Sequence, residues 1–205
     1  VLRTLKAFEN MGVKIQKKNN DLIIYGRGLN SLRKPLKELY LGNSGTSARL
    51  LTGLLSTQEF NSILTGDESL SKRPMKRITN PLELMGARFN TKNGTLPLEI
   101  HGKKLKSINY ELDIPSAQVK SGIILAALNT EGKTTILEKE ETRNHTEIML
   151  ENFEANIEIN SNNKLKNISI IGKKELISKN IQIPSDLSSA AFFIVAALIN
   201  KNSKL

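Results

Sequence analysis

Residues 41–51, which read LGNSGTSARLL, have the composition of a small-anion site. Small residues let the backbone come close to a ligand, and the apolar pattern after them predicts a helix that carries Arg49 near its start. The first N–H groups of a helix have no partner within the helix, so they attract phosphate or carboxylate together with the helix dipole. The segment is therefore a candidate anion site, although similar residues also cap many purely structural helices.

Two further segments repeat this composition. Residues 114–128 read IPSAQVKSGIILAAL and residues 183–199 read IPSDLSSAAFFIVAALI, so each places a small polar loop before an almost wholly apolar helix. Thr46 lies 70 residues before Ser116, which in turn lies 70 residues before Asp186. The regular spacing indicates an internal repeat.

A second series of signals has the same period. Amphipathic helical patterns that pass into a strand end at Gly12, Gly86 and Ala155. The later strands that close on a glycine and a basic residue end at Arg27, Lys103 and Lys173. Glycine is common just after a helix, and the spacing of both series again predicts a unit of about 70 residues.

Within one period, the pattern predicts the order strand, apolar helix, strand, amphipathic helix, strand, strand. YELDI (110–114) is an example of the strand before an apolar helix. NSILTGD (61–67) and TTILEKE (134–140) are examples of the strand after it. Asn93-Gly94 and Asn162-Asn163 are suited to the turns between the last two strands. We therefore predict an α/β (α+β) fold of repeated βαβαββ units whose apolar helices are buried.

The composition fits a globular protein with an aliphatic core, since 39% of the 205 residues are hydrophobic and only 4% are aromatic. No apolar run reaches the ~20 residues that cross a bilayer, and no signal-peptide pattern opens the chain, so we expect no membrane association. The absence of cysteine excludes disulfides, thiolate metal sites and a cysteine nucleophile, and with two histidines we expect no metal site. A reducing cytoplasm is the expected location.

The formal net charge of +10 makes nucleic acid a candidate partner. The lysines are scattered among asparagine-rich turns, however, and few aromatic residues are present that would stack on bases. We therefore expect no nucleic-acid partner and interpret the charge as favourable for small anionic substrates.

Five long motifs, in this order and spacing, resemble those of the EPSP synthase (3-phosphoshikimate 1-carboxyvinyltransferase) family. They are LGNSGTSARLL (41–51), GDESLSKRPMKRITNPLELMGA (66–87), SAQVKSGIILAALNTEGKTTI (116–136), TRNHTEIML (142–150) and IPSDLSSAAFFIVAALI (183–199). The SAQVKS and TRNHTE motifs are similar to the bacterial branch that includes glyphosate-tolerant members. The resemblance covers essentially the whole chain.

The resemblance implies an enolpyruvyl transferase-like protein of six βαβαββ units in two domains, with buried parallel helices and surrounding sheets. Residues 1–180 would form a three-unit substrate-binding domain whose first unit is incomplete at its N-terminus, and residues 181–205 would begin the second domain. The chain is thus expected to be an internal fragment.

The implied reaction belongs to the shikimate pathway, which leads to chorismate and the aromatic amino acids. It transfers the enolpyruvyl group of phosphoenolpyruvate to the 5-hydroxyl group of shikimate 3-phosphate and releases phosphate, without a metal or an organic cofactor. The full-length protein is expected to be a monomer. Because the family's general acid and base lie in the second domain, we expect no catalytic residue here and no turnover by this chain alone.

For phosphoenolpyruvate, the resemblance implies binding by Gly45, Arg73 and Gln118. Arg73 lies before Pro74, a residue that is able to start a helix without losing a needed N–H. Some glyphosate-tolerant relatives carry alanine at the position of Gly45. The glycine therefore predicts that the complete enzyme binds glyphosate, unless Leu50 and its neighbours reshape the loop.

For shikimate 3-phosphate, the resemblance implies binding by Ser116, Ala117, Gln118 and Arg143. An ordinary N-cap is the alternative role for Ser116. Asp186 matches a family carboxylate at the start of the second domain, and it would either bind substrate hydroxyls or cap the helix that follows it.

Other residues in these motifs have open roles. Asn43, Thr46 and Arg49 would either contact the ligand or cap the helix and hold the loop. Lys120 lies two positions after Gln118, on a different side of the predicted helix, so we expect it to be solvated or to lie between domains.

Two rival functions remain open. The first is the sister enolpyruvyl transferase that acts on UDP-N-acetylglucosamine, which generally uses a loop cysteine that this chain lacks. The second is a non-catalytic anion-binding module with the same repeats. The presence or absence of a downstream domain with acidic and basic catalytic groups would separate catalysis from binding alone.

Overall fold

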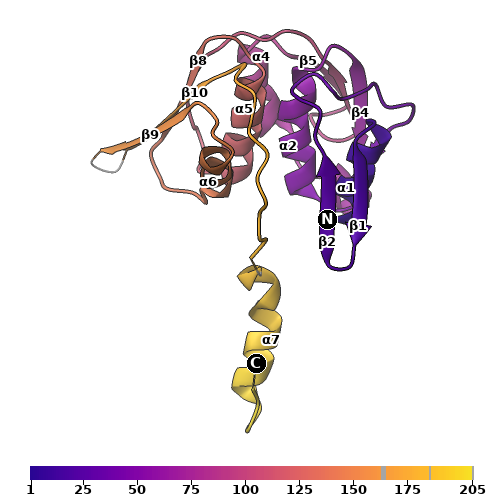
Figure 1. Ribbon diagram of the computed structural model, residues 1–205, viewed down its shortest axis with the longest axis vertical. Helices are drawn as coiled ribbons and strands as arrows, with labels where there is room; N and C mark the ends of the chain where they lie inside the picture. Colours follow the sequence, from indigo (N-terminus) through magenta and orange to yellow (C-terminus); the bar gives the residue numbers. More distant parts are fainter. Residues whose placement is uncertain (163–164, 185, 205) are drawn as a thin grey trace.

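The computed structural model describes residues 1–162, 165–184 and 186–204. It contains two complete βαβαββ units in succession, which confirms the predicted repeat (Figure 1). The first unit consists of β3 (Leu39–Tyr40), α2 (Gly45–Ser56), β4 (Asn61–Thr65), α4 (Lys76–Leu84), β5 (Arg88–Thr91) and β6 (Leu98–His101), with a short helix α3 (Glu68–Ser71) before α4. The second consists of β7 (Asn109–Glu111), α5 (Ala117–Leu128), β8 (Lys133–Glu138), α6 (His145–Asn152), β9 (Ile157–Asn162) and β10 (Leu165–Ile171).

The sheets of the two units have the same topology. The first sheet has the order β3-β4-β6-β5 and the second the order β7-β8-β10-β9. In each, the first two strands are parallel and the remaining pairs are antiparallel. The parallel pair needs a crossover, and the apolar helix α2 or α5 supplies it. Equivalent elements therefore occupy equivalent places in the two units.

The N-terminal part contains α1 (Leu2–Asn10) and the antiparallel hairpin of β1 (Lys14–Lys18) and β2 (Asp21–Tyr25). These three elements correspond to the last three of a unit, as the sequence predicts. The Lys14 ammonium lies 4.7 Å from the centre of the Tyr25 ring.

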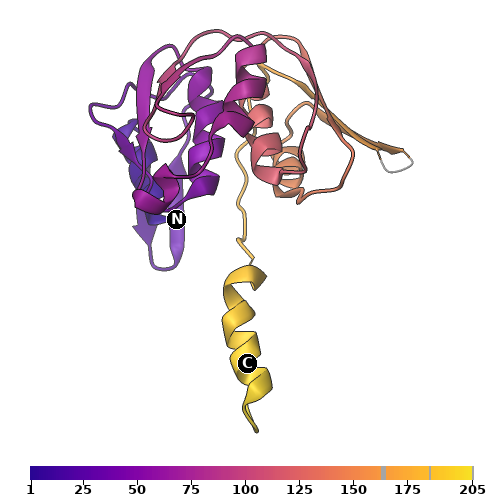
Figure 2. The ribbon, with the colours of Figure 1, turned by 180° about the vertical axis from the view of Figure 1, so that it is seen from behind.

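Helices α2 and α5 lie side by side between the sheets and are largely buried (Figures 1 and 2). Their close approach depends on two glycines, because a Cβ atom on Gly53 would lie only 1.9 Å from the carbonyl oxygen of Gly122. Apolar residues on all sides of α5 are expected for a helix with protein around it. The prediction of two buried apolar helices is confirmed, and their N-termini lie next to each other.

The glycine and basic residue that close each unit cap the C-terminus of its central helix. The backbone N–H of Lys103 donates to the carbonyl of Ser56, and that of Lys173 donates to the carbonyl of Leu128. A Cβ atom on Gly102 or Gly172 would lie within 2 Å of a backbone oxygen, at 1.8 and 1.9 Å respectively. Since the last carbonyls of a helix have no partner within it, this contact explains the motif in the two complete units.

The turn predicted at Asn93-Gly94 is confirmed, with φ of 59° and 72° at its two residues. Such values favour Asn and Gly in a tight turn between antiparallel strands. The turn predicted at Asn162-Asn163 includes Asn163, which lies outside the described residues.

Helix α7 (Leu187–Ile199) corrects one expectation. Its composition predicts burial like that of α2 and α5, but Phe192 is 84% exposed and Leu198 is 80% exposed. Residues 172–184 contain no helix or strand and lead away from the two units, so α7 lies apart from them (Figures 1 and 2). The boundary near residue 180 stays a prediction. In the described residues, no helix is long and apolar enough to cross a membrane.

Candidate functional site

The N-terminus of α2 is capped by Ser44, whose Oγ accepts a hydrogen bond of 3.2 Å from the N–H of Ser47. The Ser47 hydroxyl lies 2.7 Å from the Thr4 hydroxyl, which ties the cap to α1. The alternative role for Asn43, Thr46 and Arg49 was to cap the helix and hold the loop, and the cap is formed by Ser44. The side chains of Asn43 and Thr46 accept hydrogen bonds from Arg73 and Gln118, so the choice between holding the loop and contacting a ligand stays open.

The N-terminus of α5 is capped by Ser116, whose Oγ lies 3.4 Å from the backbone nitrogen of Val119. The alternative structural role of Ser116 is thus present in the structure. Ala117 is the first residue of the helix, and Gln118 is the second. Gln118 Nε2 donates to Thr46 Oγ1 over 2.8 Å, so the first turns of α5 and α2 are joined directly.

Arg49 lies at the centre of this junction. Its Nη1 donates to Gln118 Oε1 over 2.7 Å, and its Nη2 donates to the carbonyl of Pro74 over 3.3 Å. A weaker contact of 3.5 Å runs from Nη1 to the carbonyl of Gly45. These bonds hold the guanidinium group between the two helix starts and the loop that precedes α4.

Arg73 approaches the same place from that loop. Its Nη2 donates to Asn43 Oδ1 over 2.6 Å. A Cβ atom on Gly45 would lie 3.0 Å from Arg49 Nη1 and 3.1 Å from Arg73 Nη1. The absence of a side chain at Gly45 therefore lets two guanidinium groups converge on one stretch of backbone.

The site is strongly cationic. Burial, followed by the charges of Arg73 and Arg77, lowers the pKa of Arg49. The acceptors of Arg49 and Arg73 are neutral amides and carbonyls, and no carboxylate forms a salt bridge with either residue in the described part of the chain. We call Arg49, Arg73 and Arg77 the arginine cluster. Two guanidinium groups without a carboxylate partner, with the charge of Arg77 nearby, lie beside two helix N-termini, an arrangement that suits an anion of more than one charge.

The structure does not place every predicted residue in this cluster. Arg143 is exposed on the loop between β8 and α6. Asp186 directly precedes α7, on the segment that leads away from the two units, and its Oδ2 accepts a hydrogen bond of 2.5 Å from Ser189 Oγ. Within the described ranges, no group of three or more His, Asp or Glu side chains is placed to hold a metal ion.

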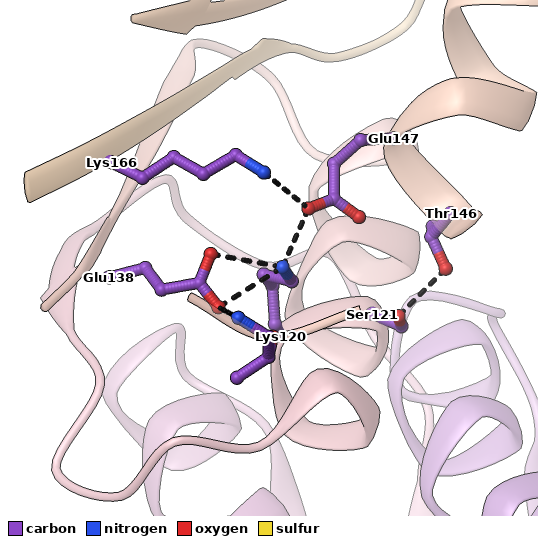
Figure 3. A network of polar contacts seen from close by, with 7 residues as sticks. Lys120, Ser121, Glu138, Thr146, Glu147 and Lys166 are labelled. Carbon is purple, nitrogen blue, oxygen red and sulfur yellow. Dashed lines mark hydrogen bonds and ion pairs between the residues drawn. The ribbon is translucent and has the colours of Figure 1, made fainter. Parts of the chain in front are cut away.

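Lys120 corrects the expectation of a solvated side chain. It is completely buried, and its Nζ lies 3.0 Å from Glu138 Oε2 and 2.7 Å from Glu147 Oε1 (Figure 3). Sequence reasoning missed these two acidic partners. The sequence did contain a signal for such partners. Lys120 lies in a helix predicted to be buried, and a buried ammonium group requires a paired charge.

The fold and the site define a class: an α/β protein of repeated βαβαββ units with a cationic site where two buried helices begin. A family model described as EPSP synthase (3-phosphoshikimate 1-carboxyvinyltransferase) matches residues 1–204. The chain belongs to the EPSP synthase family.

Individual relatives agree with this assignment. A 3-phosphoshikimate 1-carboxyvinyltransferase of Ruthia magnifica is 54% identical over 97% of this chain and 45% of that protein. The one from Streptococcus mutans is 47% identical over 100% of this chain and 48% of that protein. The solved structure of EPSP synthase from Acinetobacter baumannii is 52% identical, with a TM-score of 0.86 over 96% of this chain and 44% of that one. The chain therefore spans less than half the length of these relatives.

Proposed function

We propose that the full-length protein transfers the enolpyruvyl group of phosphoenolpyruvate to the 5-hydroxyl group of shikimate 3-phosphate. A C–O bond forms between the 5-oxygen and C2 of phosphoenolpyruvate, and the C2–O bond to phosphate breaks. The hydroxyl proton is lost and inorganic phosphate is released. The observation that carries the proposal is the arginine cluster beside the N-termini of α2 and α5 in a chain of this family.

Phosphoenolpyruvate would bind at this cluster through the backbone of Gly45 and the side chains of Arg73 and Gln118. A phosphate and a carboxylate on one small molecule match several convergent guanidinium groups. Arg49 orients the Gln118 amide through the 2.7 Å hydrogen bond to Oε1. Asn43 holds Arg73 in the same way, at 2.6 Å.

Shikimate 3-phosphate would bind at the start of α5, through Ser116, Ala117 and Gln118, with Arg143 completing the phosphate pocket. The unpaired N–H groups of the first helical turn supply donors for a phosphate monoester. The exposed guanidinium of Arg143 is accessible to such a ligand.

We assign no general acid or base to this chain. Protonation of the phosphoenolpyruvate methylene and removal of the 5-hydroxyl proton need positioned groups with suitable pKa values, which we place in the part of the relatives that this chain does not span. The isolated chain should therefore bind shikimate 3-phosphate weakly without turnover. Calorimetry that finds no binding heat at millimolar ligand, with the chain shown to be folded, would contradict this.

A phosphate-release assay on the full-length protein tests the proposed reaction. Phosphate should appear only when phosphoenolpyruvate and shikimate 3-phosphate are both present. Release with UDP-N-acetylglucosamine as the acceptor would instead support the sister activity, and binding without release would support a non-catalytic module.

We also propose that the full-length protein is cytoplasmic, because its phosphorylated substrates are too highly charged to cross a bilayer unaided. That it is a monomer is a separate expectation from the family resemblance. Cell fractionation and sedimentation at micromolar concentration test these two statements. Recovery from a membrane fraction, or a sedimenting dimer, would contradict them.

A further inference from the structure

Four charged side chains join four elements of the second unit inside the protein (Figure 3). Lys120 of α5 contacts Glu138 of β8 and Glu147 of α6, and Lys166 of β10 lies 3.8 Å from Glu147. Lys120 and Glu147 are 0% exposed, and Glu138 is 1% exposed. Burying charges costs free energy that apolar side chains of similar size would not require, so stability alone is a weak explanation for this network.

Glu138 connects the network to the loop that carries Arg143. Its Oε1 accepts hydrogen bonds from the N–H of Thr142, at 2.8 Å, and from the Thr142 hydroxyl. The same carboxylate accepts from Lys120 through both oxygens, at 3.2 and 3.0 Å. Thr142 directly precedes Arg143, so one carboxylate joins this loop to α5.

The other end of the loop is fastened to α5 as well. The hydroxyl groups of Ser121 and Thr146 lie 2.7 Å apart, and Lys120 Nζ lies 2.7 Å from Glu147. The loop therefore has two attachments to the helix whose N-terminus carries Ser116. Arg143 lies between these two attachments, and its side chain is exposed.

We propose that Glu138 is a positioning residue: held by the buried Lys120, it fixes the Arg143 loop beside the start of α5, so that one phosphate monoester meets Arg143 and Ser116 together. Glu138 touches no substrate in this arrangement and acts through Thr142. The inference rests on the proposed function only for the identity of the ligand, shikimate 3-phosphate.

The first test is Thr142→Val in the full-length protein. This change removes the hydroxyl donor to Glu138 but keeps the backbone N–H, the side-chain shape and all buried charges. The KM for shikimate 3-phosphate should rise about tenfold, while the KM for phosphoenolpyruvate changes little. Because the lost hydrogen bond was made to a buried carboxylate, the melting temperature should fall as well. Thr142→Ser should restore the value, and Thr135→Val on β8 is the matched control. Equal rises in both KM values would show a merely structural role and overturn the proposal.

A double-variant cycle then tests whether Glu138 acts through Arg143. In an Arg143→Ala background, Thr142→Val should have no further effect on the KM for shikimate 3-phosphate. The same increase in both backgrounds would overturn the proposal.

Limited trypsin cleavage gives a readout that needs no ligand. Thr142→Val should raise cleavage after Arg143, relative to cleavage after the exposed Arg27, by about fivefold, because the loop opens more often. An unchanged ratio would overturn the positioning role. A wild-type protein that does not turn over shikimate 3-phosphate would refute the proposed function, and the cleavage ratio would still decide whether Glu138 fixes the loop.

Discussion

Gln118 donates a hydrogen bond of 2.8 Å from its side-chain amide to the Thr46 hydroxyl, and the two residues hold equivalent places in two repeats. Each is the second residue of a buried helix whose N-cap is a serine. Because α2 and α5 approach closely at Gly53 and Gly122, their first turns meet, and Arg49 of α2 donates a hydrogen bond to Gln118 of α5.

Gln118→Leu should weaken this junction. The change removes one of the acceptors of Arg49 and the donor to Thr46 while keeping a similar volume. We expect a loss of about 1–3 kcal/mol in the free energy of unfolding, since hydrogen bonds to charged groups contribute on that scale. Denaturant titration of the full-length protein measures it. Gln182→Leu, at an exposed position before α7, is the matched control, and equal losses in both variants would contradict the prediction.

Gly45→Ala should disturb the arginine cluster without affecting the backbone conformation. The new methyl would lie 3.0 and 3.1 Å from two guanidinium nitrogens, so both groups must move by a few tenths of an ångström. We expect the KM for phosphoenolpyruvate and the inhibition constant for glyphosate to rise by about tenfold or more. Gly26→Ala, where a Cβ meets nothing within 4 Å, is the control. Inhibition by glyphosate that appears only in the Gly45→Ala variant would contradict the prediction.

Inorganic phosphate should stabilise the full-length protein, because an anion relieves the mutual repulsion within the arginine cluster. Phosphate at a hundred times its dissociation constant should add about 2.7 kcal/mol to the free energy of unfolding. The melting temperature in phosphate, compared with chloride at equal ionic strength, reports this effect. Arg73→Ala should reduce the shift, whereas Arg88→Ala on the exposed strand β5 should not. An identical shift in all three proteins would contradict a site at the cluster.

Gly53→Ala should destabilise the pair of central helices. Its Cβ would lie 1.9 Å from a backbone oxygen of α5, which no side-chain rotation relieves. We expect a loss of about 3 kcal/mol in the free energy of unfolding, measured by denaturant titration, as for severe overpacking of a core. If the Gly53→Ala and Gly26→Ala variants had equal melting temperatures, the prediction would be contradicted, because α2 and α5 would then move apart without a loss of stability.

Tyr110 should give an alkaline titration step of its own. Burial, followed by a hydrogen bond to Asp113 and the charge of that residue, raises its pKa to about 12. A phenol with a raised pKa in the folded state contributes stability below pH 10, and this contribution is lost as the pH rises through 12. Absorbance of tyrosinate should show a late step that Tyr110→Phe removes and Asp113→Asn moves to lower pH. A late step that persists in Tyr110→Phe would contradict the assignment.

The repeat and the apolar character of α2 and α5 were predictable from the sequence because both are patterns that can be read within one unit. An apolar segment between two strands has to be covered on all sides, and the recurring glycine and basic residue cap the helix of their own unit at Ser56 and Leu128. The same reasoning was wrong for α7, because burial also requires a second surface, and the described residues pack none against Phe192 and Leu198.

The sequence by itself indicated several helix N-termini, because a small polar segment before an apolar helix recurs with one period, and the first of these segments carries Arg49. Only the tertiary structure decided which of these residues meet. The approach of Gly53 to Gly122 brings Arg49 to Gln118, and burial joins Lys120 to Glu138 and Glu147. Sequence periodicity describes one helix at a time, whereas these contacts depend on how separate elements are placed relative to one another, which is decided when the whole domain packs.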